Sequence, residues 1–126
     1  MIISIGIDII EVRRVRETIE RTPRFAERVF TEAERAYCES RGVVAAQHYA
    51  ARFAAKEAAL KALQTGWSDG IAWQDIEISA KESGAPVITF HGRARQLYEQ
   101  TGATAAHISI AHTTEHAVAQ VVLEKV

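Results

Sequence analysis

Residues 52–63 are the stretch that most restricts the fold, because their composition suits a helix and little else. They include no proline, glycine or β-branched residue, and alanine and straight-chain charged residues have high helix propensities. Glu57 and Lys61 stand four positions apart on one helix face, and Arg52 and Lys56 form a second such pair. Two interpretations remain open at this point: a solvated helix with surface salt bridges, or a packed helix that directs a charged edge at an anion.

Alternating apolar residues predict strands near both ends of the chain, with helical patterns between them. The predicted strands cover 3–10, 76–80, 87–90, 106–112 and 117–123, and the predicted helices cover 11–20, 32–40, 44–63 and 93–100. A further short helix can open at Pro23. This order predicts an α+β fold, with an antiparallel sheet packed around one long central helix in a single domain, 1–126. The last strand is nearly all apolar, which indicates a central position in the sheet or burial at a subunit contact.

Two local patterns refine this outline. Thr31 and Glu34 have the spacing of a capping box, so we expect a helix to begin directly after Thr31. In the long helix, Tyr49, Phe53 and Leu60 fall near one stripe, and we expect that stripe to face the sheet.

Length and composition exclude several classes of protein. A chain of 126 residues fits one domain, and its single cysteine, Cys38, excludes an internal disulfide and a cysteine zinc cluster. The N-terminal residues alternate like a strand and have no basic segment, which argues against a signal peptide. No apolar run approaches the ~20 residues of a transmembrane helix. We therefore expect a cytoplasmic protein.

Charge is distributed unevenly along the chain. Residues 13–28 include six arginines and three glutamates, a net charge of +3, whereas the whole chain carries −1. A local basic patch on a mildly acidic protein suits an acidic macromolecular partner better than nucleic acid, which usually requires a basic domain overall.

Asp8 and Glu57 are the acids that suggest chemistry. Asp8 falls inside an apolar strand pattern, where it either caps the next helix or holds a metal ion, and both interpretations stay open. Two carboxylates would suit Mg²⁺, which typically takes one or two of them plus water and substrate phosphates. Lys56 and Lys61, with Arg52, would complete a site for a polyphosphate. Spacing alone does not show that Asp8 and Glu57 meet.

Motifs of other enzyme classes are missing. The sequence has no serine in a nucleophile elbow and no glycine-rich phosphate loop. The five histidines lack helical zinc spacing, and His107 and His112 are five positions apart on a predicted strand, so they point to opposite faces.

Several motifs occur in one order along the chain. They are residues 6–11, residues 52–58 followed by Lys61-Ala62, Thr65-Gly66, Gly84-x-Pro86, and Ser109-x-x-His112. Together they closely resemble the holo-(acyl carrier protein) synthase family, the small 4'-phosphopantetheinyl transferases, over essentially the whole chain. Each motif is weak alone, but the combination is specific.

The resemblance implies an activity. Enzymes of this family move 4'-phosphopantetheine from coenzyme A to a serine of apo-acyl carrier protein, which releases adenosine 3',5'-bisphosphate and supports fatty acid biosynthesis. By similarity, Asp8 and Glu57 hold Mg²⁺ and Lys61 acts with them in catalysis, while either a metal-bound water or Glu57 serves as general base. The family also implies a homotrimer with active sites between subunits.

The resemblance further implies two sets of contacts. The residues expected to bind coenzyme A are Arg52, Lys56, Lys61, Gly66, Pro86, His107, Ser109 and His112, the three last from the neighbouring subunit. The residues expected to dock the acyl carrier protein are Arg14, Arg21, Arg24 and Arg28. Two other functions compete: a non-catalytic docking protein for an acidic partner, and a phosphoesterase with a related Mg²⁺ site.

Overall fold

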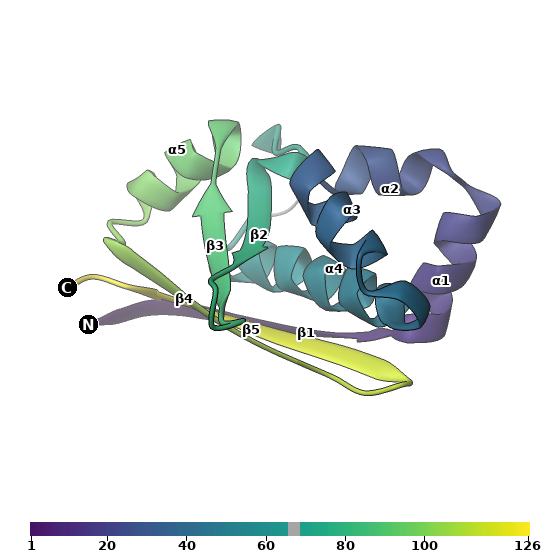
Figure 1. Ribbon diagram of the computed structural model, residues 1–126. Coiled ribbons are helices and arrows are strands. Elements are labelled where there is room, and N and C mark those ends of the chain that lie inside the picture. The colour runs from purple at the N-terminus through teal and green to yellow at the C-terminus, as the bar shows by residue number, and fades with distance from the viewer. Residues whose placement is uncertain (66–68) are drawn as a thin grey trace.

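The computed structural model describes residues 1–65 and 69–126, and its largest sheet lies against helix α4 (Ala45–Ala62). This antiparallel sheet has the order β1-β5-β4, formed by β1 (Ile2–Glu11), β5 (His116–Glu124) and β4 (Ala105–His112). Figure 1 shows α4 running along the sheet, with the remaining helices and strands on the other side of α4. Of the two interpretations of the last strand, the structure shows the central position in the sheet.

The second layer includes the remaining elements. They are α1 (Val12–Arg21), α2 (Arg24–Val29), α3 (Glu32–Glu39), the 3₁₀ turns Gly42–Val44 and Trp73–Asp75, β2 (Ile76–Ala80), β3 (Pro86–Phe90) and α5 (Gly92–Gln100). Strands β2 and β3 form a separate two-stranded sheet rather than an extension of the larger one, so the structure corrects the prediction of one sheet. The α+β class is confirmed, and no helix among the described residues is long and apolar enough to cross a membrane.

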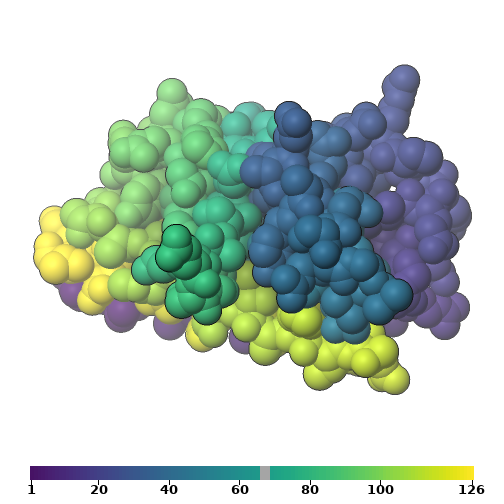
Figure 2. All heavy atoms as spheres, viewed as in Figure 1, coloured from purple at the N-terminus to yellow at the C-terminus, as the bar shows by residue number. Residues whose placement is uncertain are grey.

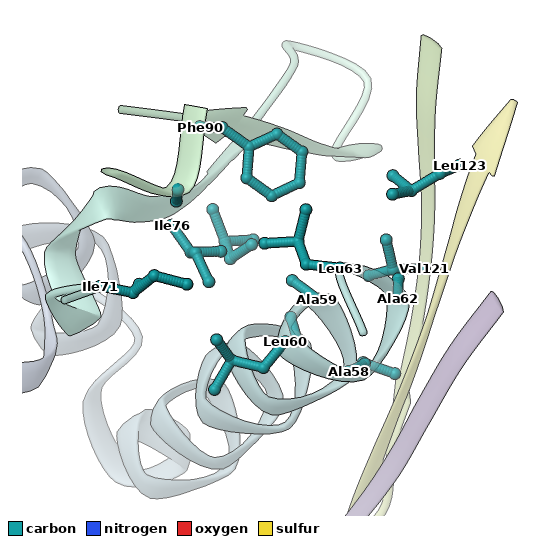
Figure 3. Packing of buried hydrophobic residues seen from close by; sticks show 14 of the residues in the cluster. Ala58, Ala59, Leu60, Ala62, Leu63, Ile71, Ile76, Phe90, Val121 and Leu123 are labelled. Atoms are coloured by element: carbon teal, nitrogen blue, oxygen red, sulfur yellow. The ribbon is translucent and has the colours of Figure 1, made fainter. Parts of the chain in front are cut away.

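Helix α4 presents alanines to the three-stranded sheet, and these small side chains allow the helix and the sheet to lie close together. Figure 3 shows Ala58 and Ala62 on the side of α4 facing the strands and Leu60 on the opposite side. The aromatic rings of Tyr49 and Phe53 make their ring contacts with the second layer: the Tyr49 ring packs on Phe30, and the Phe53 ring packs on Phe25 of α2 and on Trp73. The predicted stripe therefore faces the second layer, because large side chains would hold the sheet away from α4.

Gly6 of β1 marks the closest contact between strand and helix. A Cβ atom at this position would overlap the carbonyl oxygen of Ala58 and lie 2.7 Å from the backbone nitrogen of Ala62. Beside it, the Ser4 hydroxyl donates a hydrogen bond to the Ala62 carbonyl, so this segment of β1 is fastened to the end of α4.

Gly6→Ala is expected to destabilise the fold by roughly 2–3 kcal/mol, because both atoms that the new methyl would meet are backbone atoms. Urea unfolding would measure this loss. Gly102→Ala is a suitable control, since Gly102 has open space around it and a φ of 84°, so its cost should be only about 1 kcal/mol. A Gly6→Ala protein no less stable than Gly102→Ala would contradict this account of the packing.

Candidate active site

Two carboxylates and one ammonium group meet between β1 and α4. Ile7 and Ile9 point to the outer face of the sheet, where more than half of each side chain is exposed, so Asp8 between them points toward α4. The Lys61 Nζ lies 3.0 Å from Asp8 Oδ1 and donates a second hydrogen bond to the Ile7 carbonyl. Residues that are 53 positions apart in the sequence thus form one polar cluster.

Glu57 joins this cluster from one turn earlier in α4. Partial burial raises the pKa of its carboxyl group, the negative charge of Asp8 raises it further, and the Lys61 ammonium opposes both effects. Two neighbouring carboxylates therefore share a single positive charge, and a divalent cation would compensate the excess negative charge. No group of three or more metal-ligating side chains gathers within the described ranges, so the chain offers a two-carboxylate site with room for water and substrate oxygens.

A groove of about 460 Å³ adjoins this carboxylate pair. Its lining includes Ile9, which follows Asp8, and Phe53, which lies one turn before Glu57. Phe25 and Arg14 complete the apolar wall and its basic edge. The other arginines predicted to dock a partner are also exposed on α1 and α2, at positions Arg21, Arg24 and Arg28. The structure therefore places a basic, partly apolar surface next to the two acids.

Arg52 occupies a different hollow, of about 140 Å³, which it lines together with Pro86 and His112. Only 5% of Arg52 is exposed, and its guanidinium carbon lies 4.1 Å from the centre of the Tyr37 ring. Its Nε atom has no hydrogen-bond partner in the part of the chain that the structure describes. Figure 2 shows this face of the molecule, with hairpin β2–β3 beside α3. A buried guanidinium with an unused donor is suited to an anion.

The carboxylate cluster and the Arg52 hollow lie on different faces of α4. Arg52 and Glu57 are five residues apart, which turns their side chains about 140° away from each other around the helix axis. Glu57 and Lys61 face the edge strand β1, whereas Arg52 faces β4 and the β2–β3 hairpin. A single chain consequently presents two separate polar regions, on different faces of α4, rather than one continuous site.

Lys56 requires a correction, because the prediction that it contacts coenzyme A is wrong in this structure. Its side chain is fully buried, and Nζ lies 2.9 Å from Glu34 Oε1 and donates to the Trp73 and Ile76 carbonyls. Burial lowers the pKa of Lys56, and the Glu34 carboxylate opposes that effect. Lys56 therefore links α4 to the second layer and has no exposed atom to offer a ligand.

The Glu34 carboxylate explains why the Lys56 ammonium group can be buried. The predicted capping box is confirmed: the Glu34 amide donates to Thr31 Oγ1, and the Thr31 amide donates to Glu34 Oε1. The second carboxylate oxygen accepts the Ile78 amide of β2 at 2.7 Å. Glu34 thus caps α3, holds β2 and neutralises Lys56 at once, so that its buried charge is fully paired.

The remaining residues predicted to contact coenzyme A are divided between the two faces of the three-stranded sheet. His107 and Ser109 are exposed on the outer face, where His107 Nε2 lies 2.9 Å from Glu124 Oε1. His112 points to the opposite face and reaches Gln47 and the Arg52 hollow, so the predicted opposition of His107 and His112 is confirmed. Gly66 lies outside the described residues.

Sequence reasoning missed two residues of the Arg52 hollow, Tyr37 and His48. Neither residue belongs to a motif that the sequence analysis singled out. Their partners lie far along the chain, and no spacing within α3 or α4 could have revealed the contact between His48 and His112.

Comparisons with known proteins give consistent results along almost the whole chain. The family model of the 4'-phosphopantetheinyl transferase superfamily matches residues 4–121. A holo-[acyl-carrier-protein] synthase of Koribacter versatilis is 46% identical over 125 residues, which cover 98% of this chain and 99% of the relative.

Solved structures show the same similarity. A holo-(acyl-carrier-protein) synthase from Bacillus anthracis, in complex with CoA (3',5'-ADP), has a TM-score of 0.82 and 38% identity, and the match covers 100% of this chain and 99% of the other. The corresponding protein of Neisseria meningitidis has a TM-score of 0.88 and 29% identity, with coverage of 99% and 100%. This chain belongs to the 4'-phosphopantetheinyl transferase superfamily.

Proposed function

We propose that this protein transfers 4'-phosphopantetheine from coenzyme A to a serine hydroxyl of apo-acyl carrier protein and releases adenosine 3',5'-bisphosphate. The observation that carries the proposal is the cluster of Asp8, Glu57 and Lys61 beside a basic, partly apolar groove. The similarity to holo-[acyl-carrier-protein] synthases along the whole chain supports it. A role in fatty acid biosynthesis in the cytoplasm follows from the same proposal.

Each group of the cluster has a distinct task. Asp8 and Glu57 would hold Mg²⁺, which when bound would supply positive charge to the coenzyme A pyrophosphate. Lys61 already donates to Asp8, and its ammonium group would stabilise negative charge on the phosphate oxygens as the leaving group departs. The nucleophile belongs to the carrier protein, so this chain needs no catalytic serine or cysteine. Glu57 and a water molecule remain alternative acceptors of the serine proton.

The two polar regions on α4 support a shared active site. Coenzyme A would place its pyrophosphate at Glu57 of one subunit and its nucleotide in the Arg52 hollow of a neighbouring subunit. The outer face of the three-stranded sheet favours association, since Ile5, Ile7 and Ile9 expose 55%, 55% and 64% of their surface. We therefore propose a homotrimer in which the sites lie between subunits, with His107 and Ser109 close to the contact.

Mass spectrometry of the carrier tests the proposal. The protein would be incubated with coenzyme A, Mg²⁺ and an apo-acyl carrier protein, and the expected product is a carrier heavier by one phosphopantetheine. An unchanged carrier that nevertheless binds tightly would favour the non-catalytic docking protein. Breakdown of coenzyme A in the absence of carrier would favour the phosphoesterase.

Arg14→Ala is expected to weaken binding of the acidic carrier about tenfold, mainly through a slower association rate, because Arg14 is exposed at the edge of the groove. Stopped-flow association measured at several salt concentrations should show a shallower salt dependence for the variant. Arg95→Ala, on the exposed face of α5, is the control and should leave both quantities unchanged. If the Arg14→Ala protein kept the wild-type salt dependence, α1 would not be part of the surface that docks the carrier.

A further inference from the structure

The hydroxyl group of Ser4 in β1 reaches the end of α4, far from its neighbours in the sequence. Ser4 is only 9% exposed, and its Oγ donates a hydrogen bond of 2.5 Å to the Ala62 carbonyl oxygen. The two residues are 58 positions apart. A buried side chain that joins a strand to a helix end in this way holds the two elements at one relative position.

The Ala62 carbonyl belongs to the last turn of α4, where the helix itself offers no amide partner for four carbonyl oxygens. The three carbonyls before it accept the backbone amides of residues 63–65. The fourth, that of Ala62, accepts the Ser4 hydroxyl from a different element. Because Ala62 is fully buried, loss of the hydroxyl would leave a buried acceptor without this donor, which is energetically costly.

A β-bulge in β1 directly precedes Ser4. The pairing register with β5 shifts between Ile2 and Ser4, whereas it is regular from Ser4 to Glu11. In the regular part, alternate side chains share one face of the strand, so Ser4, Gly6 and Asp8 all point toward α4. Ser4 is therefore the first residue of an inward-facing series that leads to Asp8 of the carboxylate cluster.

Strand β1 lies at the edge of its sheet, so its position depends strongly on its contacts with α4. In the order β1-β5-β4, one side of β1 pairs with β5 and the other side has no strand partner among the described residues. Gly6 allows β1 to approach the backbone of Ala58 and Ala62, and Ser4 adds a directional bond beside this contact. Together, Gly6 and Ser4 fix both the distance of β1 from α4 and its position along the helix.

The carboxylate cluster needs such a fixed framework. Asp8 and Glu57 carry like charges beside a single ammonium group, so they repel each other until a cation binds. The Lys61 side chain is 56% exposed, and in the proposed reaction it also serves the phosphate oxygens. The Ser4 bond is buried and takes no part in the chemistry, so it persists while Lys61 changes partner.

We propose that Ser4 is a positioning residue for the metal site. Its bond to Ala62 fixes β1 on α4 and so holds Asp8 at the separation from Glu57 that a shared divalent cation requires. The inference rests on the proposed function, because that function has both carboxylates bind one cation. Ser4 acts only through the position of Asp8, so its loss weakens metal binding more than it lowers the rate at saturating metal.

Binding of Mn²⁺, followed by the EPR signal of the free ion, tests the inference without an activity assay. The full-length protein would be titrated in the presence of coenzyme A and in the absence of carrier. Ser4→Ala is expected to bind Mn²⁺ about tenfold more weakly than the wild type, as is typical when a group that supports a metal ligand is lost. Ser4→Thr, which keeps the hydroxyl group, should restore the affinity.

The rate of carrier modification gives a second readout. In Ser4→Ala, the Mg²⁺ concentration that gives the half-maximal rate should rise about tenfold, while the rate at saturating Mg²⁺ stays within about twofold of the wild type. A loss of folded protein alone would do the reverse: it would lower the saturated rate and leave the half-maximal Mg²⁺ concentration unchanged.

Thr101→Ala is the matched control, because Thr101 Oγ1 donates a hydrogen bond of 2.6 Å to the Tyr98 carbonyl at the end of α5. This change removes an equivalent bond from a helix end outside the carboxylate cluster, and it should leave the Mn²⁺ affinity unchanged. Ser4→Cys, which keeps the size of the side chain but has a weak donor, serves as a second variant if Ser4→Ala unfolds, with a smaller loss expected.

Two results would overturn the inference while leaving the proposed function in place. They are the wild-type Mn²⁺ affinity in the folded Ser4 variant that lacks the hydroxyl, and an equal loss of affinity in Thr101→Ala. A wild-type protein that binds no Mn²⁺ in the presence of coenzyme A would instead contradict the metal assignment of the proposed function itself.

Discussion

Glu57→Gln is expected to abolish transfer, with a loss of at least about a thousandfold in kcat/KM, or roughly 4 kcal/mol of transition-state stabilisation. The amide keeps the size of the side chain but removes the negative charge with which Glu57 and Asp8 would hold Mg²⁺. Initial rates of carrier modification measured over a range of Mg²⁺ concentrations would quantify the loss. We expect part of the activity to return at high Mg²⁺.

The stability of the Glu57→Gln protein should change in the opposite direction to its activity. The raised pKa of Glu57 means that its ionised form is disfavoured in the folded state, so the carboxylate costs stability above the pKa of the unfolded chain. Glu57→Gln removes this cost, and the variant should unfold at or slightly above the wild-type temperature. Glu99→Gln, at an exposed ion pair on α5, is the control and should retain full activity. Full activity of the Glu57→Gln protein would show that Glu57 takes no part in the reaction.

Lys56→Met is expected to destabilise the protein by about 3–5 kcal/mol, a large part of the stability of a typical domain. The substitution leaves the Glu34 carboxylate, which is 2% exposed, without its counter-charge, and it removes the donor to the Trp73 and Ile76 carbonyls. Equilibrium unfolding in urea would measure the loss.

Two further variants separate this effect from a general effect of losing lysine. Lys56→Met combined with Glu34→Gln should cost less than the sum of the single changes, because the unpaired charge is gone. Lys61→Met should stay within about 1 kcal/mol of the wild type, since its pair with Asp8 is partly exposed, yet lose most of its activity. A Lys56→Met protein as stable as Lys61→Met would contradict the buried-pair account.

The two lysines show how far the sequence could predict the site. Strand alternation placed Asp8 near a strand end, helix composition placed Glu57 and Lys61 on one face, and the structure brings these elements together. The same reasoning could not distinguish Lys56 from Lys61. Both stand on an alanine-rich helix, and α4 is covered on almost every side, so its sequence has no clear polar face that marks the solvent.

Glu34 shows a second limit of local patterns. Its spacing from Thr31 correctly predicted a cap, and that explanation left no reason to expect a buried partner 22 residues later. The histidine pair was equally hidden, because His48 and His112 belong to a helix and a strand that meet only in the folded chain. Local rules predicted the elements and their caps, whereas long-range pairing of charges depends on tertiary packing.

Subunit mixing tests most directly the central claim that the reaction centre is divided between two faces of α4 in neighbouring subunits. Glu57→Gln and Arg52→Met would be co-expressed with different tags, and mixed assemblies would be purified and assayed for carrier modification. Each variant alone should be inactive, because every site would lack one half. In each mixed trimer, one of the three sites combines both intact halves, so we predict about a third of the wild-type rate. Mixed assemblies no more active than the separate variants would contradict the shared site.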